Sequence, residues 1–205
     1  MTPHALKGSY SMNYFQRLKK AIFLDVAFYE EVEKDKKFTD QAMMTVALVS
    51  VVEGFMIMEG FNLITLVQGV LGSLIRFVIF AFFLSFVGTR ILPEPETKSN
   101  TGELIRTLGF AYAPGLFIIF IIFPIIDSYV YPLVLILQLA TMTIAVRQAL
   151  DFNSTVRAVG VCIVAYILMI LAFMLFTIFT EFFVEVAKNA VAPTAPAPTA
   201  PLMET

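Results

Sequence analysis

The residues that most metal and redox sites need are almost absent from this chain. It contains one cysteine, Cys162, one histidine, His4, and no tryptophan. A single cysteine excludes an intrachain disulfide, and zinc, haem and iron–sulfur sites mostly need clusters of Cys or His. We therefore expect no cofactor. Because Trp is absent, any aromatic belt at a membrane surface has to come from Tyr and Phe.

Charge is also scarce. Charged residues make up 15% of the 205 residues, against about 25% in ordinary soluble domains. Hydrophobic residues make up 59%, and the mean hydropathy is +0.83. So much apolar side chain indicates that the solvent is lipid. The net charge of −2 gives no indication of nucleic-acid binding.

Five apolar segments predict an all-α, polytopic membrane protein with five transmembrane helices, since each is close to the 20 or so residues that a span needs. They cover 41–58, 69–92, 104–126, 131–149 and 156–183, and the second span has an alternative start near 63. The predicted division is an N-terminal cytoplasmic region at 1–40, a five-helix domain at 41–185 and a Pro/Ala/Thr-rich outer tail at 186–205. The chain shows no internal repeat, which weakens the case for a transporter built on inverted repeats.

The positive residues predict the orientation. With the N-terminus in the cytoplasm, nearly all Lys and Arg fall in cytoplasmic segments or at the adjoining span ends, which is the bias expected of inner loops. The exceptions are Arg76, inside a span, and Lys188, outside. The cytoplasmic set is Lys7, Arg17, Lys19, Lys20, Lys34, Lys36, Lys37, Arg90, Lys98, Arg106, Arg147 and Arg157.

The segment 12–37 has a helical pattern. Its apolar residues Phe15, Leu18, Ile22, Val26 and Tyr29 recur at three or four residues and so share one face. The segment is predicted to be one amphipathic helix. It either lies in the membrane interface or packs in the cytosol against the membrane domain, and both can hold. The first 40 residues have no apolar signal-peptide core, so we expect no cleaved signal.

Two charged residues inside predicted spans are costly in lipid and therefore need a partner or a function. Glu53 lies in the first span and Arg76 in the second, and these helices are antiparallel neighbours. We predict an intramembrane Glu53–Arg76 ion pair that locks the helix hairpin. The alternative is a polar site for a substrate, a lipid head group or a partner's charge.

The third span contains a predicted kink at Gly109, Pro114 and Gly115. Proline removes a backbone donor and bends a helix, and glycine lets neighbouring helices approach closely. Such a kink serves a gate or a lipid-facing notch in some proteins and is an ordinary part of static bundles in others.

Three arginines are predicted at the inner membrane interface, Arg106, Arg147 and Arg157, where they can meet lipid phosphates. They also act as topology determinants. Ser154 or Thr155 is predicted to cap the fifth helix.

The chain lacks the sequence motifs of catalytic sites, including H-E-x-x-H, G-x-S-x-G and a Walker loop. Cys162 lies mid-span between apolar residues and is predicted to pack rather than react. We therefore expect that the protein is not an enzyme.

The sequence resembles the bacterial branch of the Yip-domain family, named for proteins that interact with Ypt/Rab GTPases. The resemblance runs over about 15–185 and includes FYEEVEKDKKFTDQAM at 28–43, RTLGFAYAPGL at 106–116 and AVRQALDFNSTVRAVGV at 145–161. It implies a five-helix membrane domain with a cytosolic N-terminal region, in the plasma membrane of a bacterium, working through membrane lipids and protein partners. The acidic-Tyr-Gly-Pro motif of eukaryotic members is absent around Tyr29, so the resemblance gives no ground for Rab-type GTPase binding.

Three functions are compatible with these features. The first is a non-enzymatic membrane scaffold or accessory subunit of a membrane complex. The second is a small transporter or channel with a polar site at Glu53 and Arg76. The third is a lipid-handling or membrane-curving protein that uses the amphipathic segment at 12–37.

Overall fold

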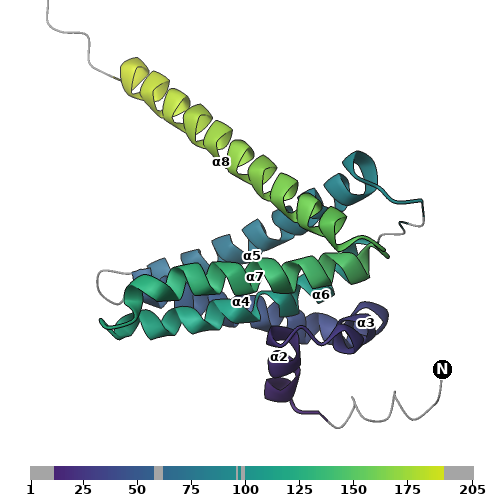
Figure 1. Ribbon diagram of the computed structural model, residues 1–205. Helices are drawn as coiled ribbons and strands as arrows, with labels where there is room; N and C mark the ends of the chain where they lie inside the picture. Colours follow the sequence, from purple (N-terminus) through teal and green to yellow (C-terminus); the bar gives the residue numbers. More distant parts are fainter. Residues whose placement is uncertain (1–11, 58–61, 96, 98–99, 192–205) are drawn as a thin grey trace, which may run out of the picture. The chain divides into compact units, whose positions relative to one another are not determined.

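The computed structural model describes residues 12–57, 62–95, 97 and 100–191, and within these residues every regular element is helical (Figure 1). The elements are α2 (Tyr14–Ile22), α3 (Val26–Lys34), the 3₁₀ turn η1 (Lys36–Phe38), α4 (Thr39–Ile57), α5 (Leu63–Phe86), the π-helical turn η2 (Val87–Ile91), α6 (Thr101–Ala111), the 3₁₀ helix η3 (Ala113–Ile122), α7 (Asp127–Ala149) and α8 (Thr155–Val191). The all-α fold class is therefore confirmed for this part of the chain.

Four helical segments of the described residues are long and apolar enough to cross a membrane. They are Leu63–Ile91, Thr101–Ile122, Asp127–Ala149 and Thr155–Ala190, and they correspond to the second to fifth predicted spans. The protein is therefore a multi-pass membrane protein. The fourth span begins four residues earlier than predicted, and α8 continues past the predicted end at 183 to Val191.

Helix α4 corresponds to the first predicted span but is not one of these four segments. Met58, the predicted end of this span, lies outside the described residues, as does the tail from 192 to 205.

The N-terminal segment forms two helices, so the prediction of one helix over 12–37 is wrong. The chain turns at Leu24, whose φ is +60°. The amide of Asp25 donates to Lys20 O (3.0 Å) and that of Leu24 to Ala21 O (3.2 Å), which is the Schellman pattern that ends a helix. The side chain of Asp25 then accepts from Phe28 N and caps α3.

The chain divides into two compact units, 1–167 and 168–205. In the first unit α4 packs against α5, α6 and η3, while α7 packs against α6 and η3. Helix α3 contacts both α6 and α7. Three aromatic rings from three segments meet where α3 joins: Phe28 lies 5.2 Å from Phe110 and 6.4 Å from Phe38, measured between ring centroids. The N-terminal segment is thus part of the core of this unit.

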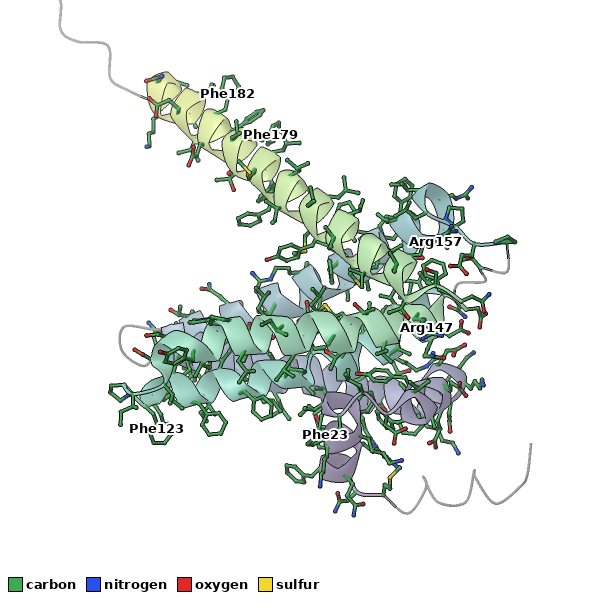
Figure 2. All side chains as sticks on the ribbon, in the orientation of Figure 1. Phe23, Phe123, Arg147, Arg157, Phe179 and Phe182 are labelled. Atoms are coloured by element: carbon green, nitrogen blue, oxygen red, sulfur yellow. The ribbon has the colours of Figure 1, made fainter. Side chains whose placement is uncertain are left out.

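The described residues of the second unit are the remainder of α8, from 168 to 191. Their apolar side chains are exposed around the helix, including Phe179 and Phe182, which Figure 2 labels. A helix that is apolar on all sides is suited to a lipid environment.

Candidate functional site

The segment Thr101–Ile122, which contains α6 and η3 and is called the third span after the predicted order, packs against α4 through two glycines. A Cβ atom at Gly109 would lie 2.7 Å from the Cβ of Ala42 and 2.9 Å from its carbonyl carbon. A Cβ at Gly115 would lie 2.5 Å from Cγ1 of Val49. No side chain fits at these distances, so both glycines are needed for α4 to lie this close to the third span.

The helix changes type at the predicted kink. Helix α6 ends at Ala111, and the 3₁₀ helix η3 begins at Ala113 with Pro114 in its first turn. Proline has no N–H to donate to the preceding turn. The hydroxyl of Thr141, fully buried on α7, donates to the carbonyl oxygen of Ala111 at 2.7 Å. The change of helix type is therefore supported by a hydrogen bond from the neighbouring span.

The two charged residues predicted to lie inside spans are on helices that pack against each other, α4 and α5. Glu53 is partly buried on α4, and Arg76 is exposed on α5, where its Nη2 donates to Ser73 Oγ at 2.8 Å. The structure shows no direct ion pair between Glu53 and Arg76, so their pairing stays a prediction.

Arg106 is used inside the protein rather than at the lipid surface, where it was predicted. Its side chain is only 4% exposed. Nε donates to Val32 O at 3.1 Å, and Nη2 donates to Glu33 O. These are carbonyls of the last turn of α3, which have no partner within their own helix. A cation is also favourable at a helix C-terminus, so Arg106 fastens α3 to the third span.

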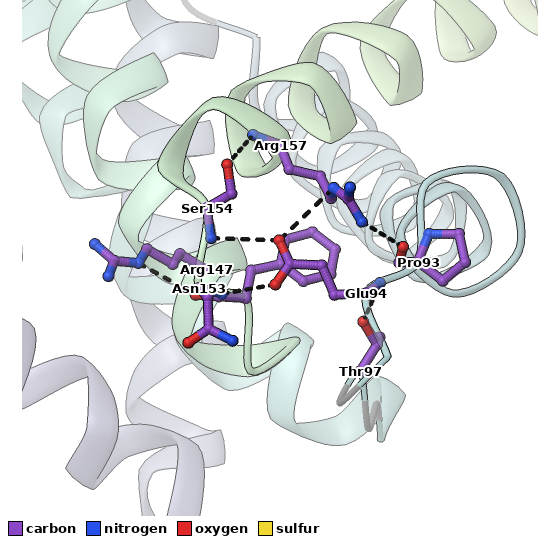
Figure 3. Close-up of polar contacts among 8 residues, drawn as sticks. Pro93, Glu94, Thr97, Arg147, Asn153, Ser154 and Arg157 are labelled. Carbon is purple, nitrogen blue, oxygen red and sulfur yellow. Dashed lines mark hydrogen bonds and ion pairs between the residues drawn. The ribbon is translucent and has the colours of Figure 1, made fainter.

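A second polar network joins the loop after η2 to the start of α8 (Figure 3). The carboxylate of Glu94, 9% exposed, accepts from Asn153 N at 2.9 Å and from Ser154 N at 3.3 Å. It also forms an ion pair with Arg157, with 3.6 Å between Oε1 and Nε. An acidic group at a helix N-terminus satisfies free amides and complements the helix dipole.

Two predicted interface arginines belong to this same region. Arg157 Nη1 donates to Pro93 O at 2.6 Å. Arg147 donates from Nε to Phe152 O and from Nη1 to Thr155 Oγ1, both at 3.2 Å. Both side chains retain some exposure, so contact with lipid phosphate stays a prediction for them.

The predicted cap of the fifth helix is confirmed. Ser154 Oγ accepts from the amide of Arg157 at 3.3 Å, directly before α8 begins at Thr155. This is the N-cap geometry in which a side-chain oxygen meets the amide three residues ahead.

An open polar cleft of about 670 Å³ lies beside these networks. Helix α3, the loop after η2 and the turn between α7 and α8 form its walls. The lining residues are Val26, Glu30, Pro95, Arg147, Gln148, Asp151, Phe152 and Asn153. The lining carries the carboxylates of Glu30 and Asp151, two side-chain amides and the guanidinium of Arg147, whose Nε and Nη1 donate to neighbouring oxygens.

Acidic side chains accumulate around this cleft. Burial, and after it the nearby carboxylate of Asp151, raise the pKa of the Glu33 carboxyl to about 7. Glu103 and Glu30 act in the same direction, while Lys34 acts against it. The carboxylates of Glu30, Glu33, Glu103 and Asp151 thus lie near enough to one another to interact electrostatically.

The described residues contain no group of three or more His, Cys, Asp or Glu arranged to hold a metal ion. Cys162 is buried, which agrees with a packing role.

No protein-family model matches the chain, and no curated protein or solved structure shows significant similarity to it. The resemblance to Yip-domain proteins therefore stays a prediction.

The sequence does not predict the contacts of two residues: Glu94, which binds amides before α8, and Thr141, which binds the carbonyl of Ala111. Glu94 lies between two prolines in PEPET, and an acidic residue in a loop gives no indication of which helix it caps. Thr141 lies in an apolar helix, and its only signal is a hydroxyl inside a span.

Proposed function

We propose that this protein is a non-enzymatic membrane scaffold, an accessory subunit that holds a partner at the cytoplasmic end of its bundle. The observation that carries this proposal is the buried Arg106, which fixes α3 to the third span through two carbonyl oxygens. Together with the Glu94 network at the start of α8, it makes the inner end a preformed surface. A preformed surface lowers the ordering cost of binding.

The proposal includes five spans, with the N-terminus inside and the C-terminus outside. Helix α4 has 19 residues, about 28 Å at 1.5 Å per residue, which is close to the hydrocarbon thickness of about 30 Å. The distribution of Lys and Arg supports the same topology. The Yip-like role and the bacterial plasma membrane belong to this proposal and rest on the resemblance of the segments at 28–43, 106–116 and 145–161.

Cysteine labelling tests the topology. In a Cys162→Ala background, Ser128→Cys should react with an impermeant maleimide on intact cells. Lys36→Cys and Asn153→Cys should react only after permeabilisation. If α4 does not cross the membrane, Lys36→Cys reacts on intact cells while Asn153→Cys stays protected. The five-span topology would then be withdrawn.

The partner that fits the cleft is a cytoplasmic protein segment with basic and hydrogen-bonding side chains, because the cleft carries two carboxylates, Glu30 and Asp151, against one guanidinium, Arg147, with two side-chain amides beside them. The test is co-purification in mild detergent with a doubly neutralised cleft, Glu30→Gln with Asp151→Asn. Asn tolerates the left-handed conformation of residue 151, where φ is +53°. Asp127→Asn, at the other end of the bundle, is the matched control.

The expected result is that companions are retained with the wild type and the control and are lost with the cleft variant. Equal retention in all three would exclude the cleft as the docking site.

The second candidate is a small transporter or channel. It is favoured by Glu53 and Arg76, two charged side chains on the contacting helices α4 and α5, where Arg76 donates to Ser73 and forms no ion pair with Glu53. Glu53→Gln in proteoliposomes tests it. Loss of a measurable flux with retained folding would support transport, whereas unchanged behaviour would leave Glu53 a structural residue.

A further inference from the structure

Helix α2 is fixed at the level where the first span begins. The hydroxyls of Tyr14 and Thr45 share a hydrogen bond of 2.8 Å, and Arg17 Nη1 donates to Gln41 Oε1 at 2.7 Å. Gln41 and Thr45 belong to the first two turns of α4, about 6 Å apart along its axis. If α4 is a span, α2 therefore lies at the inner boundary of the hydrocarbon region.

Helix α2 also crosses the direction of the bundle. Figure 1 shows it below the bundle, with its axis transverse to those of α4 and α7. Its buried residues Arg17, Leu18 and Ala21 face the bundle. A helix that crosses the spans at the membrane boundary lies in the membrane plane, as interfacial helices do.

The outward side of α2 carries two exposed phenyl rings with a lysine between them. Phe15 is 77% exposed and Phe23 73% exposed, and Figure 2 labels Phe23 at the end of this helix. The ammonium group of Lys19 lies 5.9 Å from the centroid of the Phe23 ring. Phe15 and Lys19 are four residues apart and therefore neighbours on the helix surface. Lys20 is engaged in an ion pair with Asp25, 3.0 Å long.

We infer that α2 is an interfacial anchor whose Phe15 and Phe23 enter the cytoplasmic leaflet and whose Lys19 binds the phosphate of an anionic phospholipid. Two exposed phenyl rings on a short helix are unfavourable in water and favourable at the acyl boundary. A Lys close to the membrane surface is attracted by anionic lipid. The inference rests on the proposed placement of α4 as a span.

The absence of tryptophan makes a direct test possible in the full-length protein. Single variants Phe15→Trp and Phe23→Trp are reconstituted in phosphatidylcholine vesicles containing lipids spin-labelled either near the head group or deep in the acyl chain. Val51→Trp on α4 and Lys34→Trp on α3 are the references; both native side chains are exposed. We expect the indoles at 15 and 23 to emit at short wavelength and to be quenched mainly by the shallow label.

The two reference positions separate the placement of α4 as a span from the placement of α2 at the interface. The indole at 51 should be quenched more strongly by the deep label, and the indole at 34 by neither. If position 51 is quenched while 15 and 23 are not, the interfacial anchor is excluded and the span stands. If position 51 itself is not quenched, α4 is not a span, and the anchor and the five-span topology both fail.

A second comparison tests the lipid charge. Raising the phosphatidylglycerol fraction should increase shallow quenching of the indole in Phe23→Trp. Adding Lys19→Gln should abolish this increase, whereas adding Lys34→Gln should preserve it. An increase that survives Lys19→Gln, or no increase at all, would exclude Lys19 as the phosphate ligand.

Discussion

Arg106 donates from Nε to the carbonyl oxygen of Val32 at 3.1 Å and so joins the third span to the N-terminal segment, 74 positions away in sequence. Arg106→Met removes the donors and leaves buried carbonyls unsatisfied. We expect a loss of about 3 kcal/mol in stability and faster amide exchange throughout α3. Hydrogen exchange in detergent measures both.

Arg106→Lys keeps the charge but cannot place two donors in the same fork, so it should have an intermediate effect. If α3 exchanges at wild-type rates in Arg106→Met, Arg106 does not hold the inner surface together.

The close contact between α4 and the third span gives the second prediction. Gly109→Ala places a methyl group within 2.7 Å of the Ala42 Cβ, and we expect a destabilisation of about 1–3 kcal/mol. Gly72→Ala is the matched control, because no atom lies within 4 Å of the added methyl, and Ala is favoured over Gly within a helix by about 1 kcal/mol. Thermal denaturation in detergent should show a lower midpoint for the first variant and an equal or higher one for the second.

Glu33 is expected to make the stability of the folded protein depend on pH. Burial and the Asp151 carboxylate raise the pKa of Glu33 to about 7, whereas an unfolded Glu titrates near 4.3. The folded protein therefore holds this proton more tightly than the unfolded chain does. The resulting stability is complete below the unfolded pKa and is lost as the pH rises through about 7.

Glu33→Gln should therefore gain stability over the wild type as the pH rises from 5 to 8, and the measurement is the difference in denaturation midpoint across this range. A difference that stays constant with pH would contradict the raised pKa.

Glu94 and Arg157 provide an internal comparison. Glu94→Ala removes the acceptor of two backbone amides at the start of α8, and we expect a loss of about 1–2 kcal/mol with faster exchange at 153–158. Arg157→Gln removes an ion pair whose arginine side chain is 42% exposed and should cost less than about 1 kcal/mol. Similar effects of both variants would show that the amide contacts of Glu94 are not the main interaction.

The sequence alone predicts the apolar part of this fold well. The helices of the second, third, fourth and fifth spans follow from hydrophobic length, and the cap at Ser154 follows from its position before an apolar run. The change of helix type at Pro114 follows from the missing N–H of proline. These features depend on residues close to one another in sequence.

The break at Leu24 could not be predicted in the same way, because a non-glycine residue in the left-handed conformation has no sequence signature. Asp25 followed by Phe28 was the available signal, since Asp is a preferred N-cap. This N-cap signal was overlooked because the apolar pattern of 12–37 continues with helical spacing through both α2 and α3.

The role of Arg106 illustrates a different limit. Arginine near a span end is usually a topology determinant, and nothing in RTLGFAYAPGL indicates that a helix 74 positions away offers two carbonyl oxygens. Long-range side-chain-to-backbone contacts of this kind depend on how the segments pack, which local pattern does not specify.

The central claim is that this protein holds a partner on a preformed inner surface. The most direct test is the mass and composition of the particle extracted from native membranes in mild detergent. We expect a particle larger than the chain, with defined companions that are lost in Glu30→Gln with Asp151→Asn. A lone monomer or homodimer in both preparations would contradict it.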